Sequence, residues 1–381
     1  MWKYSLIYLS FFLLLCNNCI EVLMREITDE KRKIIEHRTD FLVPGMELAH
    51  DICSADGKIL FAKNSIISQH NIQKLGNWQI PKVFVYAEVT AANPIVDPKI
   101  QKFLNTYNQS VLVVQKAFDD IRATQKVPLD TFTATAADIA ESVTEAGNVI
   151  DRLYNLPPCD DYTMYHSVNV SAISALIATW LKFPPEQVNA ISLAGLLHDV
   201  GKSLLPPELL HKPYKLSPEE YEQYRKHVSY GYELVSKIPD ISQSITAAVF
   251  QHHERRDGSG YPGGITDYYI HPYAKIIAVA DLYDEGLTIN RENPQSMLSP
   301  YCSLQKLWDE VYRLDPKACI TFADTMADFL SGNRVMLTDG REGRVVFINK
   351  KKPSSSMVQL DDGSVVDLSE HPEVYIHYVV R

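Results

Sequence analysis

The chain has 381 residues, of which 46% are hydrophobic and 22% charged, an ordinary composition for a globular protein of two or three domains. It excludes a collagen-like, low-complexity or wholly disordered chain, and a multi-span membrane protein as well, because only one apolar run approaches spanning length. Lysine and arginine number 37 against 47 aspartates and glutamates, so the net charge is −10. Because nucleic-acid binding needs a basic face, we expect no DNA or RNA partner.

Residues 1–23 form an apolar leader. Lys3 precedes the run LIYLSFFLLL, which has the length of a signal-peptide core but is short for a membrane span, and no small-x-small cleavage site follows. We interpret the leader either as a translation artefact, with Met24 as the true start, or as a weak membrane anchor. The six cysteines are scattered and lack the density of a disulfide scaffold, so we expect a reduced, cytoplasmic protein.

Residues 24–92 are predicted to form a small α/β module. Turn signals separate β-type runs at 59–61 and 83–86, and a helix is expected near 68–78. Residues 93–155 are predicted to hold a linker and two helices. Apolar residues from Ile100 to Ile121 fall on one helical face, and a second helix is expected over 136–153. That face either packs against the next domain or serves as a dimer or signalling helix, so a homodimer remains open.

Residues 156–330 are almost wholly helical in pattern. Ser217-Pro218-Glu219-Glu220 is a good helix start, and neither a βαβ alternation nor a GxxxxGK[ST] phosphate loop is present. Residues 331–381 contain short β-rich runs separated by turn signals, which predict a small barrel or meander. The expected fold is therefore mainly α: a multi-helix domain, preceded by a small α/β module and followed by a small β-rich domain.

Histidines and aspartates gather in the helical region. Seven of the 12 histidines lie between positions 166 and 281, while Asp199 and Asp281 each follow a long apolar run. A carboxylate in such surroundings costs several kcal/mol unless a positive charge meets it. Two aspartates and five histidines from successive helices are most simply explained by bound divalent cations. The set comprises His166, His198, Asp199, His227, His252, His253 and Asp281.

The two adjacent pairs in this set constrain the local structure. Neighbouring residues on a helix diverge by about 100°. The pairs 198–199 and 252–253 should therefore lie where a helix ends, or divide between two ions. We hypothesise one ion held by His166, His198, Asp199 and Asp281. A second ion, sharing Asp199, would be held by His227, His252 and His253.

The order of these residues resembles the HD-GYP family of cyclic-di-GMP phosphodiesterases. His166 is followed by HDVGK at 198–202, His227, HHERRDGSGYPGG at 252–264 and Asp281. HDVGK alone indicates only the HD superfamily of metal-dependent phosphohydrolases, whereas the added segment makes the resemblance specific. The flanking VPGMELAHDICSADGKIL and the β-rich tail are similar to modules found beside such domains.

The resemblance implies an HD-type metal-binding domain at 156–330 that hydrolyses cyclic-di-GMP to pGpG, and further to GMP, in bacterial second-messenger signalling. The seven histidines and aspartates match the family's metal ligands, and Lys202 matches the lysine that faces the scissile phosphate, so Lys202 and Asp199 are the expected catalytic residues. The implied substrate-binding residues are Lys202, Asp257, Gly258, Tyr261, Pro262 and Arg291. The GYP segment is further associated with protein partners.

The expected mechanism is attack on phosphorus by a hydroxide that bridges two cations. Mixed histidine–aspartate ligation favours iron or manganese. Some members of the family hold a third ion through a glutamate four residues before the first histidine, and Tyr162 stands there, so we expect two ions. The segment YDEGLTINREN also departs from the family, being one residue longer than usual and lacking its proline. A mixed cyclic GMP–AMP phosphodiesterase, a cyclic-dinucleotide sensor with little turnover, and a hydrolase of another nucleotide are the alternatives.

Overall fold

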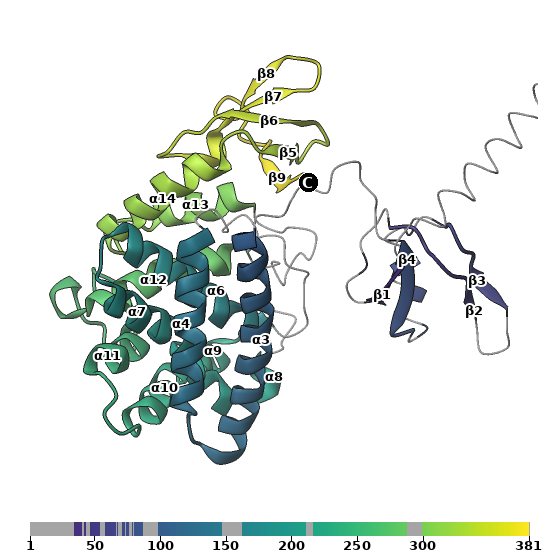
Figure 1. Cartoon of the computed structure of the whole chain (residues 1–381). Coiled ribbons are helices and arrows are strands. Elements are labelled where there is room, and N and C mark those ends of the chain that lie inside the picture. The colour runs from purple at the N-terminus through teal and green to yellow at the C-terminus, as the bar shows by residue number, and fades with distance from the viewer. Residues whose placement is uncertain are drawn as a thin grey trace, which may run out of the picture. The chain divides into compact units, whose positions relative to one another are not determined.

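Two compact units, residues 1–96 and 97–381, make up the computed structural model of the chain (Figure 1). The structure describes residues 34–39, 42, 46–53, 58–65, 67, 71–72, 74–75, 78, 80–86, 98–146, 162–210, 216–287 and 299–380. Helices dominate these residues, with small sheets towards either end of the chain, as predicted for a mainly α fold.

The N-terminal unit contains two antiparallel strand pairs. Strand β1 (Ile34–Arg38) pairs with β4 (Lys82–Tyr86), and β2 (Ile52–Cys53) pairs with β3 (Ile59–Phe61). Their small core includes Leu48, Leu75 and Val85. Both predicted strands are confirmed, and the residues described as helical at 71–72 and 74–75 fall within the predicted helix.

The prediction that the protein is anchored in a membrane is wrong as far as the described residues are concerned. None of the described helices combines the length and the apolar composition that a bilayer crossing requires. The leader, residues 1–23, and Met24 lie outside the described residues.

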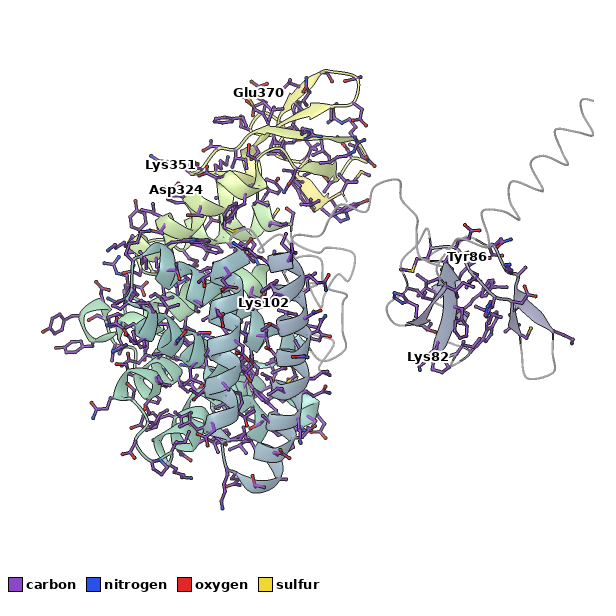
Figure 2. The ribbon with its side chains drawn as sticks, in the orientation of Figure 1. Lys82, Tyr86, Lys102, Asp324, Lys351 and Glu370 are labelled. Carbon is purple, nitrogen blue, oxygen red and sulfur yellow. The ribbon has the colours of Figure 1, made fainter. Side chains whose placement is uncertain are left out.

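The second unit begins with two long antiparallel helices. Helix α3 (Pro98–Thr124) buries one apolar face that includes Phe103, Tyr107 and Phe118, as its periodicity predicts. Helix α4 (Leu129–Ala146) begins seven residues before the predicted start, since Phe132 and Thr135 also face the core and packing outweighs the low helix propensity of the threonines. On the surface of α3, Lys102 forms ion pairs with Glu141 and Glu145 of α4 (Figure 2).

The centre of the unit is α6 (Tyr162–Trp180). Its residues from Ser167 to Ala178 are all buried, since α3, α4, α7, α12 and α14 pack around it. A helix without a polar stripe is stable only in such a position. The helices that follow are short: α7 (Pro185–Leu197), 3-10 helix η2 (Val200–Leu204), α8 (Pro207–Leu210), α9 (Pro218–Tyr224), α10 (His227–Ser236), α11 (Gln243–Gln251), 3-10 helix η3 (Asp267–Tyr269), α12 (Pro272–Leu287), α13 (Pro300–Asp309) and α14 (Pro316–Leu330).

Local chemistry sets the ends of these helices. The predicted start of α9 is confirmed as a full capping box between Ser217 and Glu220, and α14 begins at Asp315, whose side chain accepts from the backbone N–H of Ala318. Helices α7 and α11 are capped at their C-termini by His198 and His252. The prediction that both adjacent pairs lie at helix ends is therefore confirmed.

The C-terminal residues form a five-stranded antiparallel sheet that lies beside α13 and α14 (Figure 1). Strands β5 (Arg334–Leu337), β6 (Glu342–Phe347), β7 (Met357–Leu360) and β8 (Val365–Asp367) form a meander, and β9 (Ile376–Val379) returns to pair with β5. One face, with Val335, Val345 and Val358, joins the helical core. The predicted meander is confirmed. Strand β8 was not predicted, because only three residues lie between the turns on either side of it.

The packing of η2 on α10 yields a stability prediction. A Cβ atom on Gly201 would overlap the carbonyl oxygen of His227, which cannot move without displacing the backbone, whereas one on Gly231 first meets a methyl group of Val249 at 3.1 Å. Gly201→Ala should lower the free energy of unfolding by about 2–3 kcal/mol. Gly231→Ala, which gains helix propensity, should change it by less than about 1 kcal/mol. Urea denaturation of both variants checks this, and equal losses would contradict it.

Candidate metal centre

Five separate helical segments bring the seven predicted ligands together. His166 lies on α6, His198 and Asp199 follow α7, and His227 is the first residue of α10. His252 and His253 follow α11, and Asp281 lies on α12. Six of these side chains are almost fully buried, and that of His253 is 11% exposed. A region that is otherwise apolar thus contains seven polar side chains pointing at one another.

Asp199 lies at the middle of this arrangement. Its Oδ2 atom is 3.2 Å from Nε2 of His198 and 3.5 Å from Nε2 of His166, while its Oδ1 atom is 3.3 Å from Nε2 of His227 and 4.0 Å from Nε2 of His252. The ligand atoms form two groups, each spanning at most 4.8 Å. One group comprises His166, His198 and Asp199, and the other comprises Asp199, His227, His252 and His253.

Asp281 lies close to histidines of both groups. Its Oδ1 atom is 3.1 Å from Nε2 of His166 and 3.9 Å from Nε2 of His198, and its Oδ2 atom is 3.6 Å from Nδ1 of His253. Both buried carboxylates therefore lie close to the imidazoles, an arrangement in which oxygen and nitrogen donors can reach the same cation.

Three of the histidines are oriented by backbone carbonyl groups that precede them closely in sequence. Nδ1 of His198, His227 and His252 donates to the backbone carbonyl three residues earlier in each case, at 2.7–2.8 Å. This bond fixes the tautomer and leaves a lone pair on Nε2. Within the described part of the chain, Nε2 of His227 and of His252 has no hydrogen-bond partner although both atoms are buried. These lone pairs fit a bound divalent cation, which would satisfy both.

The charges in the centre are those of metal ligands. Burial lowers the pKa of His227 to about 4 and that of His252 to about 3, so both imidazoles are neutral at pH 7. Burial would raise the pKa of Asp199, but His198 and Lys202 outweigh it and hold the pKa well below its usual value. Burial likewise opposes ionisation of Asp281, and its hydrogen bond with His166 lowers its pKa nonetheless.

Lys202 lies at the edge of the centre. Its ammonium group forms an ion pair with Oδ2 of Asp199 and lies 5.2 Å from the centre of the Tyr224 ring. Burial would lower the pKa of Lys202, yet Asp199 outweighs burial and raises it, so the side chain stays charged. Burial raises the pKa of Tyr224 to about 12, which keeps the phenol protonated. The centre thus has a fixed cation and a neutral hydroxyl group at its rim.

The GYP loop, residues 253–266, covers one side of the centre. The ring of Tyr261 stacks on that of His253 at 4.6 Å, and the guanidinium of Arg225 lies 4.5 Å from the centre of the Tyr261 ring. Below the loop, the buried Glu254 carboxylate accepts from the backbone N–H groups of Gly263 and Ile265 at 2.6 and 3.1 Å. The loop is therefore held against the ligands from both sides.

Comparison with known proteins agrees with this geometry. Residues 134–318 match the HD domain family. The cyclic di-GMP phosphodiesterase PA4108 of Pseudomonas aeruginosa is 31% identical over 233 residues, which are 61% of this chain and 56% of that protein. The cyclic di-GMP phosphodiesterase response regulator RpfG of Xanthomonas campestris is 40% identical over 120 residues, 31% of this chain and 32% of that protein. Residues 134–318 form an HD domain of the HD-GYP type.

Two further proteins are similar to this chain. A 3'3'-cGAMP-specific phosphodiesterase of Vibrio cholerae is 36% identical over 137 residues, 36% of this chain and 31% of that protein. The chain thus spans about half or less of the length of these curated relatives. The structure of Bd1817, an HDG"Y"P protein from Bdellovibrio bacteriovorus, shares the fold with a TM-score of 0.52 at 17% identity, covering 77% of this chain and 99% of that one. HD domains of this class are metal-dependent, and the cluster around Asp199 could bind a metal.

The predicted substrate-binding residues of the HD-GYP domain occupy different settings. Tyr261 lies against the centre, as does Lys202. Asp257 lies at the outer rim, where it accepts from the backbone N–H and hydroxyl of Ser259 and lies 3.3 Å from Arg313. Gly258, with a φ of 77°, directly follows Asp257, and Pro262 directly follows Tyr261 through a cis peptide bond. Arg291 lies outside the described residues, as does the side chain of Tyr162.

Several residues of the HD-GYP domain were not predicted from sequence. Asp284 binds Nδ1 of His166 at 2.8 Å, and its spacing of three from Asp281 on one helix was a usable signal. Glu254 directly follows the double histidine. Tyr224 and Arg225 lie close to His227 in sequence, but nothing in a single sequence distinguishes them from other surface residues of a short helix.

Cation binding by the HD-GYP domain should release a proton. Burial by itself lowers the pKa of His166, but hydrogen bonds to Asp281 and Asp284 raise it to about 10, so without metal this imidazole is charged at pH 7. A cation can take Nε2 only after that proton leaves. Calorimetry with Mn²⁺ in buffers of different ionisation enthalpy should show release of about one proton at pH 7, and affinity should rise with pH up to about tenfold per unit.

Histidines outside the centre provide the control for this measurement. His271→Ala should leave the proton count unchanged, because His271 contacts the backbone of Tyr273 rather than the cluster. Binding without net proton release in the wild-type protein would show that His166 is already neutral.

Proposed function

We propose that this protein is a metal-dependent phosphodiesterase that hydrolyses cyclic-di-GMP to pGpG, and further to GMP, in bacterial second-messenger signalling. The observation on which this rests is the pair of ligand groups that share Asp199, with Lys202 beside them. Curated relatives are named cyclic di-GMP phosphodiesterases, which favours this dinucleotide as the substrate.

The proposed centre holds two cations, with iron and manganese as the best fit to its mixed nitrogen and oxygen donors. One would be held by His166, His198, Asp199 and Asp281. The other would be held by Asp199, His227, His252 and His253. When bound, cations of this kind activate water as a nucleophile at neutral pH and stabilise charge on phosphoryl oxygens.

The protein's own side chains would orient the scissile phosphate. Lys202 remains charged and lies within reach of Asp199, so it is placed to donate hydrogen bonds to a non-bridging oxygen. The protonated hydroxyl of Tyr224, next to Lys202, can donate to the phosphate or to the departing ribose oxygen. Neither group needs to change its charge to act at neutral pH.

The rim would contact the remainder of the substrate. The guanidinium of Arg225 lies 4.5 Å from the Tyr261 ring centre and 6.0 Å from the Tyr221 ring centre, and it forms an ion pair with Glu222 at 2.6 Å, so rings and carboxylate together hold it in place. A positioned guanidinium at the rim suits a substrate with a second phosphate. We also propose the GYP loop as a contact for protein partners, since Tyr268 and Tyr269 just beyond it are largely exposed.

A mixed cyclic GMP–AMP dinucleotide is the second candidate substrate, because a relative of similar identity is named as specific for 3'3'-cGAMP. It has the same two phosphates and differs in one base, so the metal centre and Lys202 would treat both substrates alike. The discrimination would depend on the rim.

Turnover by purified protein tests the proposal. With Mn²⁺ or Fe²⁺ under reducing conditions, cyclic-di-GMP should yield pGpG, and chromatography of parallel reactions with cyclic GMP–AMP and mononucleotides ranks the substrates. His198→Ala and Asp199→Ala should each lower kcat by roughly 10³-fold or more, since each removes a cation ligand. His371→Ala, at an exposed position near the C-terminus, is the matched control. Retained turnover in a folded Asp199 variant would refute the metal mechanism.

Lys202 provides a separate test of the chemical step. Lys202→Met keeps the length of the side chain but removes the charge, so kcat should fall by roughly 10²-fold with a smaller change in KM. Lys317→Met, at an exposed position on α14, should leave both constants unchanged. A rise in KM alone would assign Lys202 to substrate binding rather than to the transition state.

A further inference from the structure

We propose that the hydroxyl group of Tyr107, on α3, is a positioning group for the metal centre. It would act through Asn169 and Asp284 on His166, so the inference rests on the metal centre proposed above. Tyr107 is a positioning residue in this scheme, because it contacts no ligand atom itself.

Three hydrogen bonds connect Tyr107 to His166. The Tyr107 hydroxyl donates to Oδ1 of Asn169 at 2.6 Å, and Nδ2 of Asn169 donates to Oδ1 of Asp284 at 2.8 Å. The other carboxylate oxygen of Asp284 lies 2.8 Å from Nδ1 of His166. All four residues are at most 5% exposed. All three hydrogen bonds therefore lie in the interior of the unit.

The chemistry of the groups fixes the direction of every bond. An ionised carboxylate only accepts, so both Asn169 and His166 must donate to Asp284. Asn169 then has to turn its oxygen the other way, and the Tyr107 hydroxyl supplies the donor that this oxygen requires. With Nδ1 of His166 committed to Asp284, its Nε2 atom is the one available to a cation.

Helix α3 lies outside the region that matches the HD domain, which begins at residue 134. It nevertheless meets the centre at a second point, since Nε of Arg122 donates to the carbonyl oxygen of Ser203, directly after Lys202, at 3.1 Å. The Tyr107 ring is further held by Phe103 and Tyr165, with ring centres 5.9 and 6.4 Å away. A rigidly packed ring is what a positioning hydroxyl needs.

Metal affinity of the full chain, measured with Mn²⁺ against a chelator, is the test. Tyr107→Phe should weaken Mn²⁺ binding roughly three- to tenfold, and Asp284→Asn roughly 10–100-fold, as found for partners that contact a ligand directly. Asn169→Leu, which removes both of its bonds, should fall between the two. At saturating Mn²⁺, Tyr107→Phe should leave KM for cyclic-di-GMP unchanged. The electron paramagnetic resonance spectrum of bound Mn²⁺ should broaden or shift in all three variants.

Tyr301→Phe is the matched control, because the Tyr301 hydroxyl is equally buried and donates to the carbonyl of Leu330 at 2.8 Å, away from this chain of bonds. Both Tyr→Phe variants should lower Tm, but only Tyr107→Phe should alter metal affinity. Wild-type affinity in both would overturn the positioning role while leaving the metal centre intact. A wild-type protein that binds no Mn²⁺ or Fe²⁺ would overturn the centre and this inference together, whereas metal binding without turnover would overturn only the phosphodiesterase function.

Discussion

Two carboxylates, those of Asp199 and Asp281, are buried in the helical unit, and the helices around them are arranged to stabilise their charge. Neither could remain ionised in an apolar interior without compensating groups. Helices α7 and α11 end beside these carboxylates and α10 begins there, so that each of the three contributes an imidazole. Lys202 adds a permanent positive charge beside Asp199. Three helix ends and two longer helices, α6 and α12, therefore meet at the centre, and the central helix α6 is buried on all sides because the others surround it.

The cluster of candidate ligands could be predicted from sequence in part because the geometry of several of its members is local. His198, His227 and His252 each donate to the carbonyl three residues earlier, so the tautomer and orientation of the ring depend on one helical turn. The meander and the face of α3 were predictable for the same reason, since a short period in the sequence specifies each. Contacts between residues far apart in the sequence could not be predicted, because the local pattern around one residue carries no information about the other. Asn169 and Asp284 are 115 positions apart, and the early start of α4 depends on burial of Phe132 in a core formed elsewhere.

The GYP loop is held in place by side chains of the loop itself and of the segments beside it. Its glycines suggest freedom of movement, yet Glu254 accepts two of its backbone N–H groups from below and Arg313 reaches Asp257 and Ser259 at the outer rim. Arg256 and Lys275 both meet Asp267 just after the loop. Glycine is needed here for close approach of the backbone as well as for turns, since a Cβ atom on Gly260 would overlap the backbone at His253 and Arg255. The loop would therefore offer the proposed substrate a preformed surface.

The hydrogen bonds around His166 bear on the residue at which the helical unit begins. The match to the HD domain family covers residues 134–318 and leaves out α3. Compactness places the boundary at residue 97 instead, which includes α3. The hydrogen bonds from Tyr107 to His166 favour the second boundary, because a metal ligand is only as well oriented as the groups that hold its other ring nitrogen. In this protein those groups extend one helix beyond the residues that match the HD domain family, so α3 belongs with the proposed metal centre rather than with the linker before it.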